Sequence, residues 1–304
     1  MGKNILITGA SGLVGTRLTE LLLQNGSRVA HLGRAKKDGS IPTYKWDIQK
    51  NEIDSQAFEG MDTIIHLAGA GVAEKRWTAQ RKTEILESRT KSTALLYEKL
   101  KSGDHTIKTF ISASAIGYYG IDSNDQIIDE QFPQGTDFLA QVTGEWEREV
   151  DRMNELNIRT VKLRTGIVLS NKGGALMEMV KPIRLGVGSA LGSGNQYLSW
   201  IHLDDLCGMF IKSTEDDQMH GAYNATGTSY CTNRELTKLI AKVLKKPLWL
   251  PPVPGFVLKI IIGEMADIVL SGAKVSSAKI QKRGFQFKFT DLESTVSSLL
   301  QAKN

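Results

Sequence analysis

The sequence predicts an α/β protein built on a doubly wound parallel sheet, with a smaller C-terminal α/β part. Short β-rich runs alternate with helical patterns through the first half of the 304 residues, and a glycine-rich turn joins the first run to the first helix. Strands that alternate with helices form parallel sheets, because each helix crosses back to the start of the next strand. The strands predicted for this sheet are residues 4–8, 28–32, 63–68, 109–114 and 159–163.

The first two predicted strands enclose an amphipathic helix. Val14, Leu18, Leu21 and Leu22 recur at helical spacing, and Gly26 stands where a helix-ending glycine is expected. The start of the chain therefore predicts one strand–helix–strand unit.

The pattern becomes less regular after Leu169. A glycine-rich stretch at 186–194 is followed by a strand-like run at 197–203 and by a helix that opens at Asp204. A helical pattern at 233–244, a proline cluster and a terminal helix from Thr290 complete the chain. We predict a large domain of residues 1–170 completed by 200–228, and a smaller substrate-binding part formed by 171–199 and 229–304.

The composition argues against several functional classes. The net charge of +5 comes from 38 basic residues spread among 33 acidic ones, so a nucleic-acid surface is not indicated. Charged residues interrupt the apolar stretch at 257–270, which does not predict a membrane span. Cys207 and Cys231 lack the spacing of a disulfide framework or a zinc site. We expect a cytoplasmic protein with no metal, no nucleic-acid partner and no membrane association.

A glycine motif stands where the first predicted strand passes into the first helix. Glycines in such a turn let the backbone approach a pyrophosphate and let the helix pack on the strand. The free N–H groups of the helix N-terminus then bind the phosphates. In this position the motif predicts a dinucleotide-binding Rossmann fold. The cofactor-binding residues that it predicts are Gly9, Ser11, Gly12, Leu13, Val14 and Gly15.

The end of the second strand indicates which dinucleotide binds. An acidic side chain there would accept hydrogen bonds from an unphosphorylated ribose, but the sequence has Arg34, followed by Lys36 and Lys37. An arginine can pair with a 2′-phosphate through charge-assisted hydrogen bonds. We therefore expect NADP(H) as the cofactor, with Arg34 at its 2′-phosphate.

By these features the chain resembles the extended short-chain dehydrogenase/reductase superfamily, in particular its nucleotide-sugar epimerase/dehydratase group. Segment 66–70 resembles the segment that lies against the adenine ribose, and segment 46–48 the acidic turn at the adenine edge. Segment 112–114 is similar to the strand that carries the catalytic serine, which falls on Ser114. The further cofactor contacts that the resemblance implies are Asp47, Ile48, Leu67, Ala68 and Gly69.

The whole length is similar to an atypical branch, the sugar-nucleotide epimerase-like family with a C-terminal domain of unknown function. Segments 163–169, 200–205 and 284–287 carry this match. The resemblance also implies that Arg164, in the first of these segments, binds the cofactor.

The chain departs from the superfamily at its acid/base pair. The family uses a Tyr-x-x-x-Lys pair on the helix after the serine strand, but Phe138 and Val142 stand at these positions, and neither can transfer a proton. A second such spacing, Tyr97 to Lys101, lies before the serine strand, and we interpret it as a solvated helix face. Tyr118, just after the serine strand, is the candidate for a displaced phenol.

Two functional hypotheses follow. The first is an NADP(H)-dependent oxidoreductase or epimerase-like enzyme that uses Ser114 with Tyr118 or an ordered water, and whose ligand cleft includes the glycine-rich stretch at 186–194. The alternative is a non-catalytic NADP(H)-binding sensor or regulatory protein. Leu198 stands where nucleotide-sugar enzymes commonly carry a diphosphate-binding arginine. We therefore expect a small polar or anionic substrate, of which a nucleoside diphosphate sugar is only one candidate. The resemblance also implies a possible homodimer.

Overall fold

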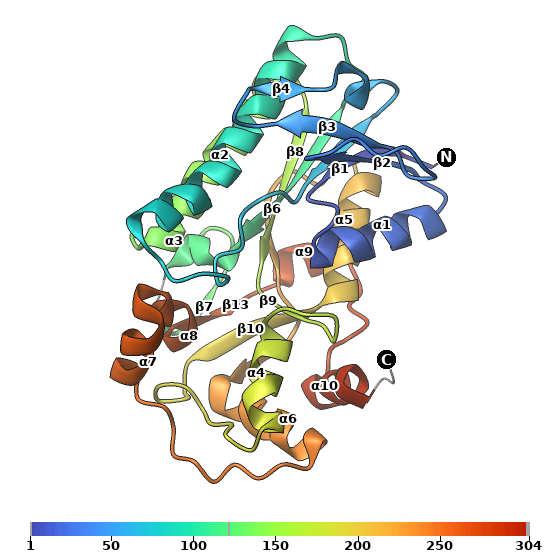
Figure 1. Cartoon of the computed structure of the whole chain (residues 1–304). Coiled ribbons are helices and arrows are strands. Elements are labelled where there is room, and N and C mark those ends of the chain that lie inside the picture. The colour runs from blue at the N-terminus through green and yellow to red at the C-terminus, as the bar shows by residue number, and fades with distance from the viewer. Residues whose placement is uncertain (1, 121, 302–304) are drawn as a thin grey trace.

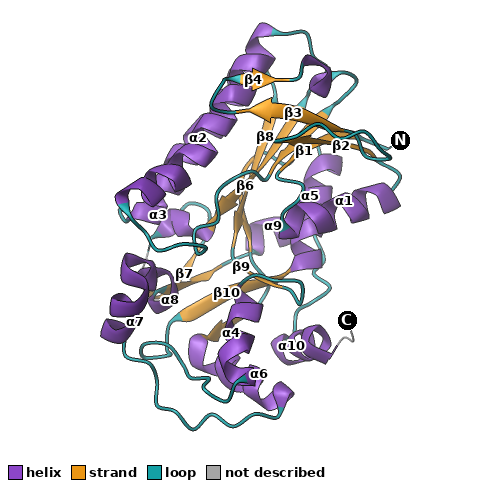
Figure 2. Ribbon diagram, in the orientation of Figure 1, coloured by secondary structure: helices purple, strands orange, loops and turns teal. Residues whose placement is uncertain are grey.

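The computed structural model describes residues 2–120 and 122–301, and its centre is one large sheet with helices on both faces (Figures 1 and 2). The strands lie in the order β11-β8-β6-β5-β1-β2-β3-β4, and every neighbouring pair is parallel except β3 with β4. Their bounds are β1 Asn4–Thr8, β2 Arg28–Gly33, β3 Thr43–Asp47, β4 Glu52–Ile53, β5 Thr63–His66, β6 Thr109–Ala115, β8 Arg159–Thr165 and β11 Gly221–Ala225.

Helices cover both faces of this sheet. Leu22 of α1 and Phe210 of α5 belong to one buried cluster, and Leu96 of α2 and Val150 of α3 belong to the other. The sheet is therefore doubly wound, as the sequence predicts. The bounds are α1 Leu13–Gln24, α2 Ala79–Ser102, α3 Phe138–Asp151 and α5 Leu203–Glu215.

The strand order reverses between β1 and β5. From β1 the chain adds β2 and β3 on one side, and from β5 it adds β6 and β8 on the other. The loops that leave the carboxyl ends of β1 and β5 therefore diverge at the same edge of the sheet. Ligands of doubly wound folds bind at such a switch point.

A smaller part lies beyond this edge of the sheet, below it in Figure 1. Its strand β10 pairs in parallel with β9 and antiparallel with β12, while β7 pairs with β13. A capping box of Thr232 and Glu235 starts α6 at the residue predicted. The bounds are β7 Asp122–Ile128, β9 Ile167–Leu169, β10 Tyr197–His202, β12 Tyr230–Thr232, β13 Gly272–Val275, α4 Ala175–Arg184, α6 Asn233–Leu244, α7 Gly255–Ile262, α8 Ala266–Leu270, α9 Ala278–Lys282 and α10 Leu292–Gln301.

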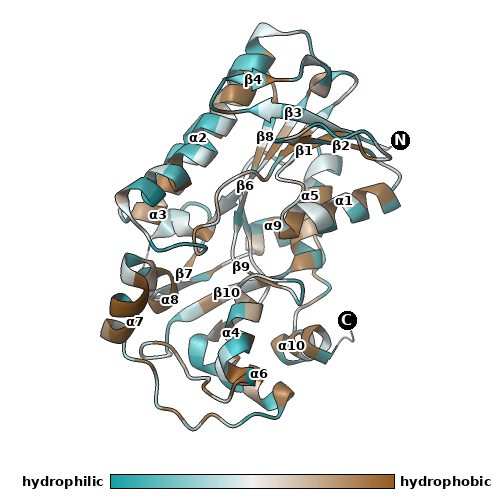
Figure 3. Ribbon diagram, viewed as in Figure 1, coloured by the Kyte–Doolittle hydropathy of each residue, from teal (hydrophilic) through white to brown (hydrophobic). Residues whose placement is uncertain are grey.

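The C-terminal segments contact both parts of the molecule. β11 returns to the large sheet beside β8, and Ile280 of α9 is buried in the core on the α1 side of that sheet. The apolar stretch predicted at 257–270 forms α7, a short 3₁₀ turn and α8. Phe256, Ile260 and Ile261 of α7 are exposed, and α7 is strongly hydrophobic in Figure 3. Among the described residues, no helix has both the length and the apolar character that crossing a membrane requires.

Candidate active site

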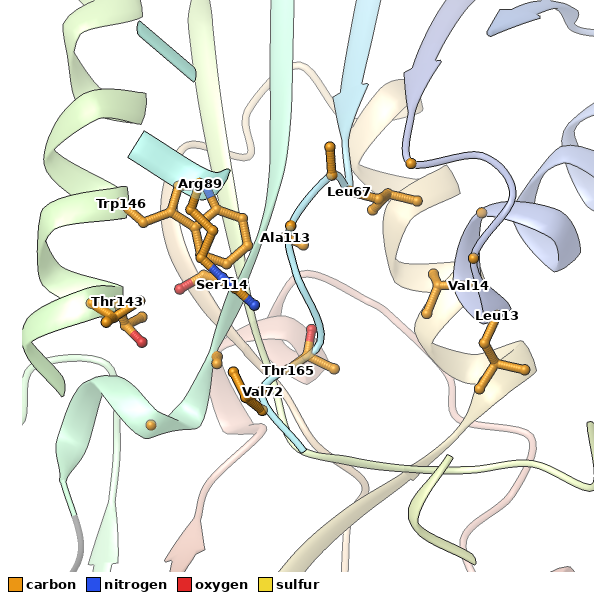
Figure 4. Close-up of a pocket in the computed structure, with 18 of the residues that line it drawn as sticks. Leu13, Val14, Leu67, Val72, Arg89, Ala113, Ser114, Thr143, Trp146 and Thr165 are labelled. Atoms are coloured by element: carbon orange, nitrogen blue, oxygen red, sulfur yellow. The ribbon is translucent and has the colours of Figure 1, made fainter. Parts of the chain in front are cut away.

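A cleft of about 370 Å³ lies at the switch point of the large sheet, and we call it the central cleft. The glycine turn after β1 and residues 67–69 after β5 form one side of its lining, and Ser114 of β6 with residues of α3 forms the other. Figure 4 shows Leu13 and Val14 across the cleft from Ser114, Arg89 and Trp146. The structure thus brings together Gly9, Gly12 to Gly15, Leu67 to Gly69 and Ser114, as expected from the sequence. Ser11 is exposed and is not part of the lining.

The backbone of the glycine turn leaves no room for side chains. Gly9 has φ +69°, and a Cβ there would lie 2.8 Å from the amide nitrogen of Ala68. A Cβ on Gly15 would lie 2.5 Å from the carbonyl oxygen of Gly9. Gly12 caps α1, and no side chain accepts a hydrogen bond from that helix start within the described residues. The result is a backbone cradle at a helix N-terminus that carries partial positive charge.

The hydroxyl of Thr8 fixes the two loops relative to each other. Its Oγ1 accepts hydrogen bonds of 3.2 Å from the amides of Leu67 and Ala68 and contacts Nδ1 of His66 at 2.8 Å. Burial lowers the pKa of His66 to about 3, so this imidazole is neutral and serves a structural role.

An outer recess of about 460 Å³ includes the residues predicted for the adenine end of the cofactor. Arg34, Asp47 and Ile48 line it together with Ser88 and Lys91 of α2. Asp47 is held in a turn, because its Oδ1 accepts hydrogen bonds from the amides of Gln49 and Lys50. Arg34 is exposed at the end of β2.

Arg89 of α2 is a cleft residue that the sequence analysis did not identify. Its Nη1 donates to the backbone carbonyl oxygens of Ala70 (3.0 Å) and Ile85 (2.9 Å), and its guanidinium lies 5.3 Å from the centre of the Trp146 ring. Burial, with the neighbouring charge of Arg81, lowers the pKa of Arg89 to about 10, so it remains a cation at neutral pH. A partly buried cation on the cleft wall suits an anionic ligand.

Ser114 lies at the edge of a buried network of charged groups. Its hydroxyl donates to Oε1 of Glu147 at 2.6 Å, and Glu147 accepts two hydrogen bonds of 2.8 Å from Nε and Nη2 of Arg164. Burial favours the neutral form of Glu147, but the ion pair with Arg164 outweighs burial and holds the pKa of this carboxyl below its usual range. Because the hydroxyl of Ser114 donates its hydrogen bond to a carboxylate, its oxygen can only accept a further hydrogen bond.

The structure does not bring Arg164 or Tyr118 to the central cleft. The guanidinium of Arg164 is occupied by Glu147 and by the hydroxyl of Tyr119 at 3.0 Å, and it stacks 3.5 Å from the ring centre of Tyr118. Neither side chain belongs to the lining of the cleft. The hydroxyl of Tyr119 is also engaged, because it donates a hydrogen bond to Oδ1 of Asn224. Burial raises the pKa of this phenol to about 12.

The residues that replace the acid/base pair lie at two adjoining cavities. Val142 lines the central cleft, whereas Phe138 lines a further pocket of about 260 Å³ between α3, β10 and α8. We call this the second pocket. Gly117 and Leu139 belong to the walls of both cavities, so the two adjoin.

Two sequence interpretations need correction. Tyr97 is not on a solvated helix face: it is buried, and its hydroxyl donates to Glu155. The glycine-rich stretch at 186–194 borders neither the central cleft nor the second pocket, because it packs on the segment around Val253 through backbone hydrogen bonds.

Arg89 in the cleft and Glu147 behind Ser114 were not predicted, although both carried a signal in the sequence. Arg89 follows buried Ile85 by four residues and precedes buried Leu96 by seven, so it lies on the inner face of α2. Glu147 likewise follows buried Thr143 by four residues on α3. A charged residue on an otherwise buried helix face needs a partner or a ligand.

Comparison with known proteins identifies the family over most of the chain. The model for the NAD dependent epimerase/dehydratase family matches residues 5–225, and the model for a domain of unknown function, DUF1731, matches 253–299. An epimerase family protein of Staphylococcus epidermidis is 32% identical over 302 residues, which is 99% of this chain and 100% of the relative. One of Staphylococcus aureus is 34% identical over 304 residues, covering 98% of this chain and 99% of the relative.

Solved structures of epimerase proteins have the same fold as this chain. The crystal structure of the human epimerase family protein SDR39U1 with NADPH superposes with a TM-score of 0.86 at 28% identity, covering 99% of this chain and 100% of that one. A nucleoside-diphosphate sugar epimerase of Corynebacterium glutamicum gives a TM-score of 0.81 at 29% identity, covering 99% of this chain and 58% of that one. The family resemblance read from the sequence is confirmed, and this chain belongs to the NAD dependent epimerase/dehydratase family.

Proposed function

We propose that this protein is an NADPH-dependent oxidoreductase that acts on the carbonyl group of a small molecule. The observation that carries the proposal is the junction of the central cleft with the second pocket at Gly117 and Leu139, beside Ser114. A nicotinamide cofactor in the central cleft and a substrate in the second pocket would meet there. We place the activity in the cytoplasm, where buried free thiols such as Cys207 and Cys231 stay reduced.

The described residues fit a dinucleotide phosphate. Gly9 and Gly15 let the turn pack tightly, because Cβ atoms there would meet backbone atoms. The N-terminus of α1 at Gly12 suits a pyrophosphate, and Arg89 adds a cation on the opposite wall. Arg34 in the outer recess supplies a charge for a 2′-phosphate, which favours NADPH over NADH. The human relative crystallised with NADPH supports the same preference.

Bound NADPH would supply a hydride to the carbonyl carbon, and the carbonyl oxygen would take a proton from water as the C=O π bond breaks, which leaves NADP⁺ and hydroxide. The protein's own contribution is orientation. The hydroxyl of Ser114 donates to Glu147, so its oxygen accepts a hydrogen bond from a water or a substrate hydroxyl at the cleft. Val142 and Phe138 exclude solvent from the same region without adding a proton donor.

The alternative is a non-catalytic sensor of NADP(H). It is favoured by the lack of a tyrosine or lysine at the usual acid/base positions. Neither Phe138 nor Val142 can transfer a proton, and Tyr118, the displaced candidate, packs on Arg164 outside the cleft. Under this alternative NADPH binds and is not consumed.

Bound-NADPH fluorescence separates the two functions. The protein is mixed with stoichiometric NADPH in a stopped-flow instrument, and ring aldehydes and ketones are added in turn. The proposed function predicts loss of the reduced-cofactor signal with at least one carbonyl compound and formation of the corresponding alcohol. Tight binding of NADPH with no oxidation across the panel would leave the sensor as the better account.

A further inference from the structure

The second pocket, between α3, β10 and α8, has a composition that differs from a nucleotide-sugar site. Among the described residues that line it there is no lysine or arginine, while three carboxylates, Asp137, Glu264 and Asp267, are present. A diphosphate carries negative charge and is normally held by arginine, lysine or helix N-termini. A substrate with that charge would meet like charges here.

Most polar side chains of this pocket make contacts within the protein. Asp137 caps α3 by accepting from the amides of Leu139 and Ala140, and the carboxylates of Glu264 and Asp267 pair with Lys82 and Lys259. Their hydrogen-bonding capacity is therefore largely spent on the fold.

The hydroxyl of Ser199 is also used internally. It donates to the carbonyl oxygen of Ala273 at 2.6 Å and accepts from the amide of Val275 at 2.9 Å. Ser271 donates to the carbonyl oxygen of Asp267. With these groups engaged, the pocket offers a ligand few free polar contacts.

The remaining wall is aromatic and aliphatic. Trp77 and Phe138 meet edge to face with their ring centres 5.0 Å apart, and the indole N–H of Trp77 donates to the carbonyl oxygen of Val72. Ile116, Ile167 and Ile268 add to the apolar surface, and Tyr197 also lines the pocket. A cavity of about 260 Å³ with such walls matches a ring system of one or two fused rings.

We propose that the second pocket binds an uncharged carbonyl compound with an aromatic or alicyclic body, and not a nucleoside diphosphate sugar. This rests on the proposed oxidoreductase function. The ring body packs between Phe138, Trp77 and Ile268, and its carbonyl group points to the shared wall at Gly117 and Leu139. The replacement of tyrosine by Phe138 thus becomes part of the substrate wall. The pocket favours an uncharged body over the polar or anionic compound expected from the sequence.

The test compares an uncharged aldehyde with an analogue that carries one carboxylate and with a nucleotide sugar. Calorimetric titrations use the full chain saturated with NADP⁺, so that no turnover occurs, with 2-naphthaldehyde, 6-formyl-2-naphthoic acid and UDP-glucose as probes. The proposal predicts that the uncharged aldehyde binds at least about tenfold more tightly than the carboxylate and than UDP-glucose, because no lysine or arginine lines the pocket, and Lys82 and Lys259 beside it are already paired with Glu264 and Asp267. Equal or tighter binding of either anion would overturn it.

Two variants of Ile268 sharpen the test. Ile268→Lys places an ammonium in the wall, and it should reduce the preference for the uncharged aldehyde by about tenfold or reverse it. Ile268→Met, the matched control, keeps the apolar wall and should keep the preference. An unchanged preference in a folded Ile268→Lys protein would contradict the proposal, and if that variant does not fold, the wild-type comparison still decides.

The outcome is separable from that of the proposed function. If the uncharged aldehyde binds preferentially but NADPH is never oxidised, the substrate-class inference stands and the oxidoreductase proposal fails. If NADPH is oxidised only by carboxylated or nucleotide-linked compounds, the oxidoreductase stands and the inference fails. Titrations without cofactor give the same ordering of the probes should NADP⁺ fail to bind.

Discussion

Ser114 and Glu147, 33 residues apart in the chain, share a hydrogen bond of 2.6 Å in which the serine hydroxyl donates to the carboxylate. Glu147 is in turn paired with Arg164 through two contacts of 2.8 Å, and all three side chains are buried. Ser114 is the member of this network that lines the central cleft, so the network sets which hydrogen-bonding role the serine presents to a ligand.

We expect Glu147→Gln to destabilise the protein by about 3 kcal/mol at pH 7, because it leaves the buried guanidinium of Arg164 without a counter-charge. The pKa of Glu147 is depressed in the folded state, so its contribution is present above the unfolded pKa and is lost as the pH falls through the folded pKa. The difference between wild type and variant in denaturant unfolding should therefore shrink as the pH falls below about 4. Glu178→Gln, at an exposed pair with Lys181, is the control and should change nothing measurable. A pH-independent difference would contradict this assignment.

Most of the fold could be predicted from local pattern, but this network could not. The runs at 4–8 and 28–32 and the capping box before α6 carry their structure in neighbouring residues, and the observed elements agree with them. Short strands near the edge of the sheet such as β3, where only Trp46 is buried, carry too weak a pattern to be predicted. Glu147 meets Ser114 and Arg164 only after β6, α3 and β8 have packed together, and no short-range spacing encodes such a contact.

The glycine turn, in contrast, could be predicted from the sequence, because the glycine spacing stands directly between the first strand and the first helix. Gly12→Val should leave the protein folded and abolish NADPH binding, since the branched side chain at the start of α1 occupies the space needed by the pyrophosphate. Gly15→Ala should instead lower stability by about 1–3 kcal/mol, because its Cβ meets backbone atoms of Gly9 and Ala10 at 2.5 and 2.6 Å. Thermal unfolding and NADPH fluorescence titration, applied to both variants, measure the two effects. Normal NADPH affinity in folded Gly12→Val would mean that the cleft does not bind the cofactor.

Restoring the missing acid/base pair tests the role of the second pocket wall. Val142 lines the central cleft and Phe138 the adjoining pocket, so Phe138→Tyr with Val142→Lys places a phenol and an ammonium four residues apart at their junction. We expect the double variant to reduce model carbonyl compounds at least about tenfold faster than wild type, a modest part of what general acid catalysis supplies. Burial of the new ammonium at Val142 should lower its stability. Phe138→Tyr alone is the control, and equal rates for both variants would show that the lysine position is not beside the reacting groups.

Ser114→Ala tests the cleft-facing oxygen directly. Loss of this acceptor should lower kcat for carbonyl reduction while leaving the Kd for NADPH within about twofold, because positioning of the proton source is lost and the glycine cradle is intact. Tyr118→Phe is the comparison, and its turnover should equal that of wild type because Tyr118 packs on Arg164 outside the cleft. A large loss of turnover in Tyr118→Phe with none in Ser114→Ala would reverse these assignments.

The most direct test of the central claim is a calorimetric titration of NADPH and NADH into wild type and Arg34→Ala. Arg34 is exposed at the edge of the outer recess, so its contact with a 2′-phosphate should be worth about tenfold in affinity. Lys36→Ala is the matched control from the same loop, since Lys36 lies 3.8 Å from Asp54. The account predicts one NADPH per chain, bound about tenfold more tightly than NADH, with the preference lost in Arg34→Ala and kept in Lys36→Ala. Equal affinity of the wild-type protein for the two cofactors, or no binding of either, would contradict it.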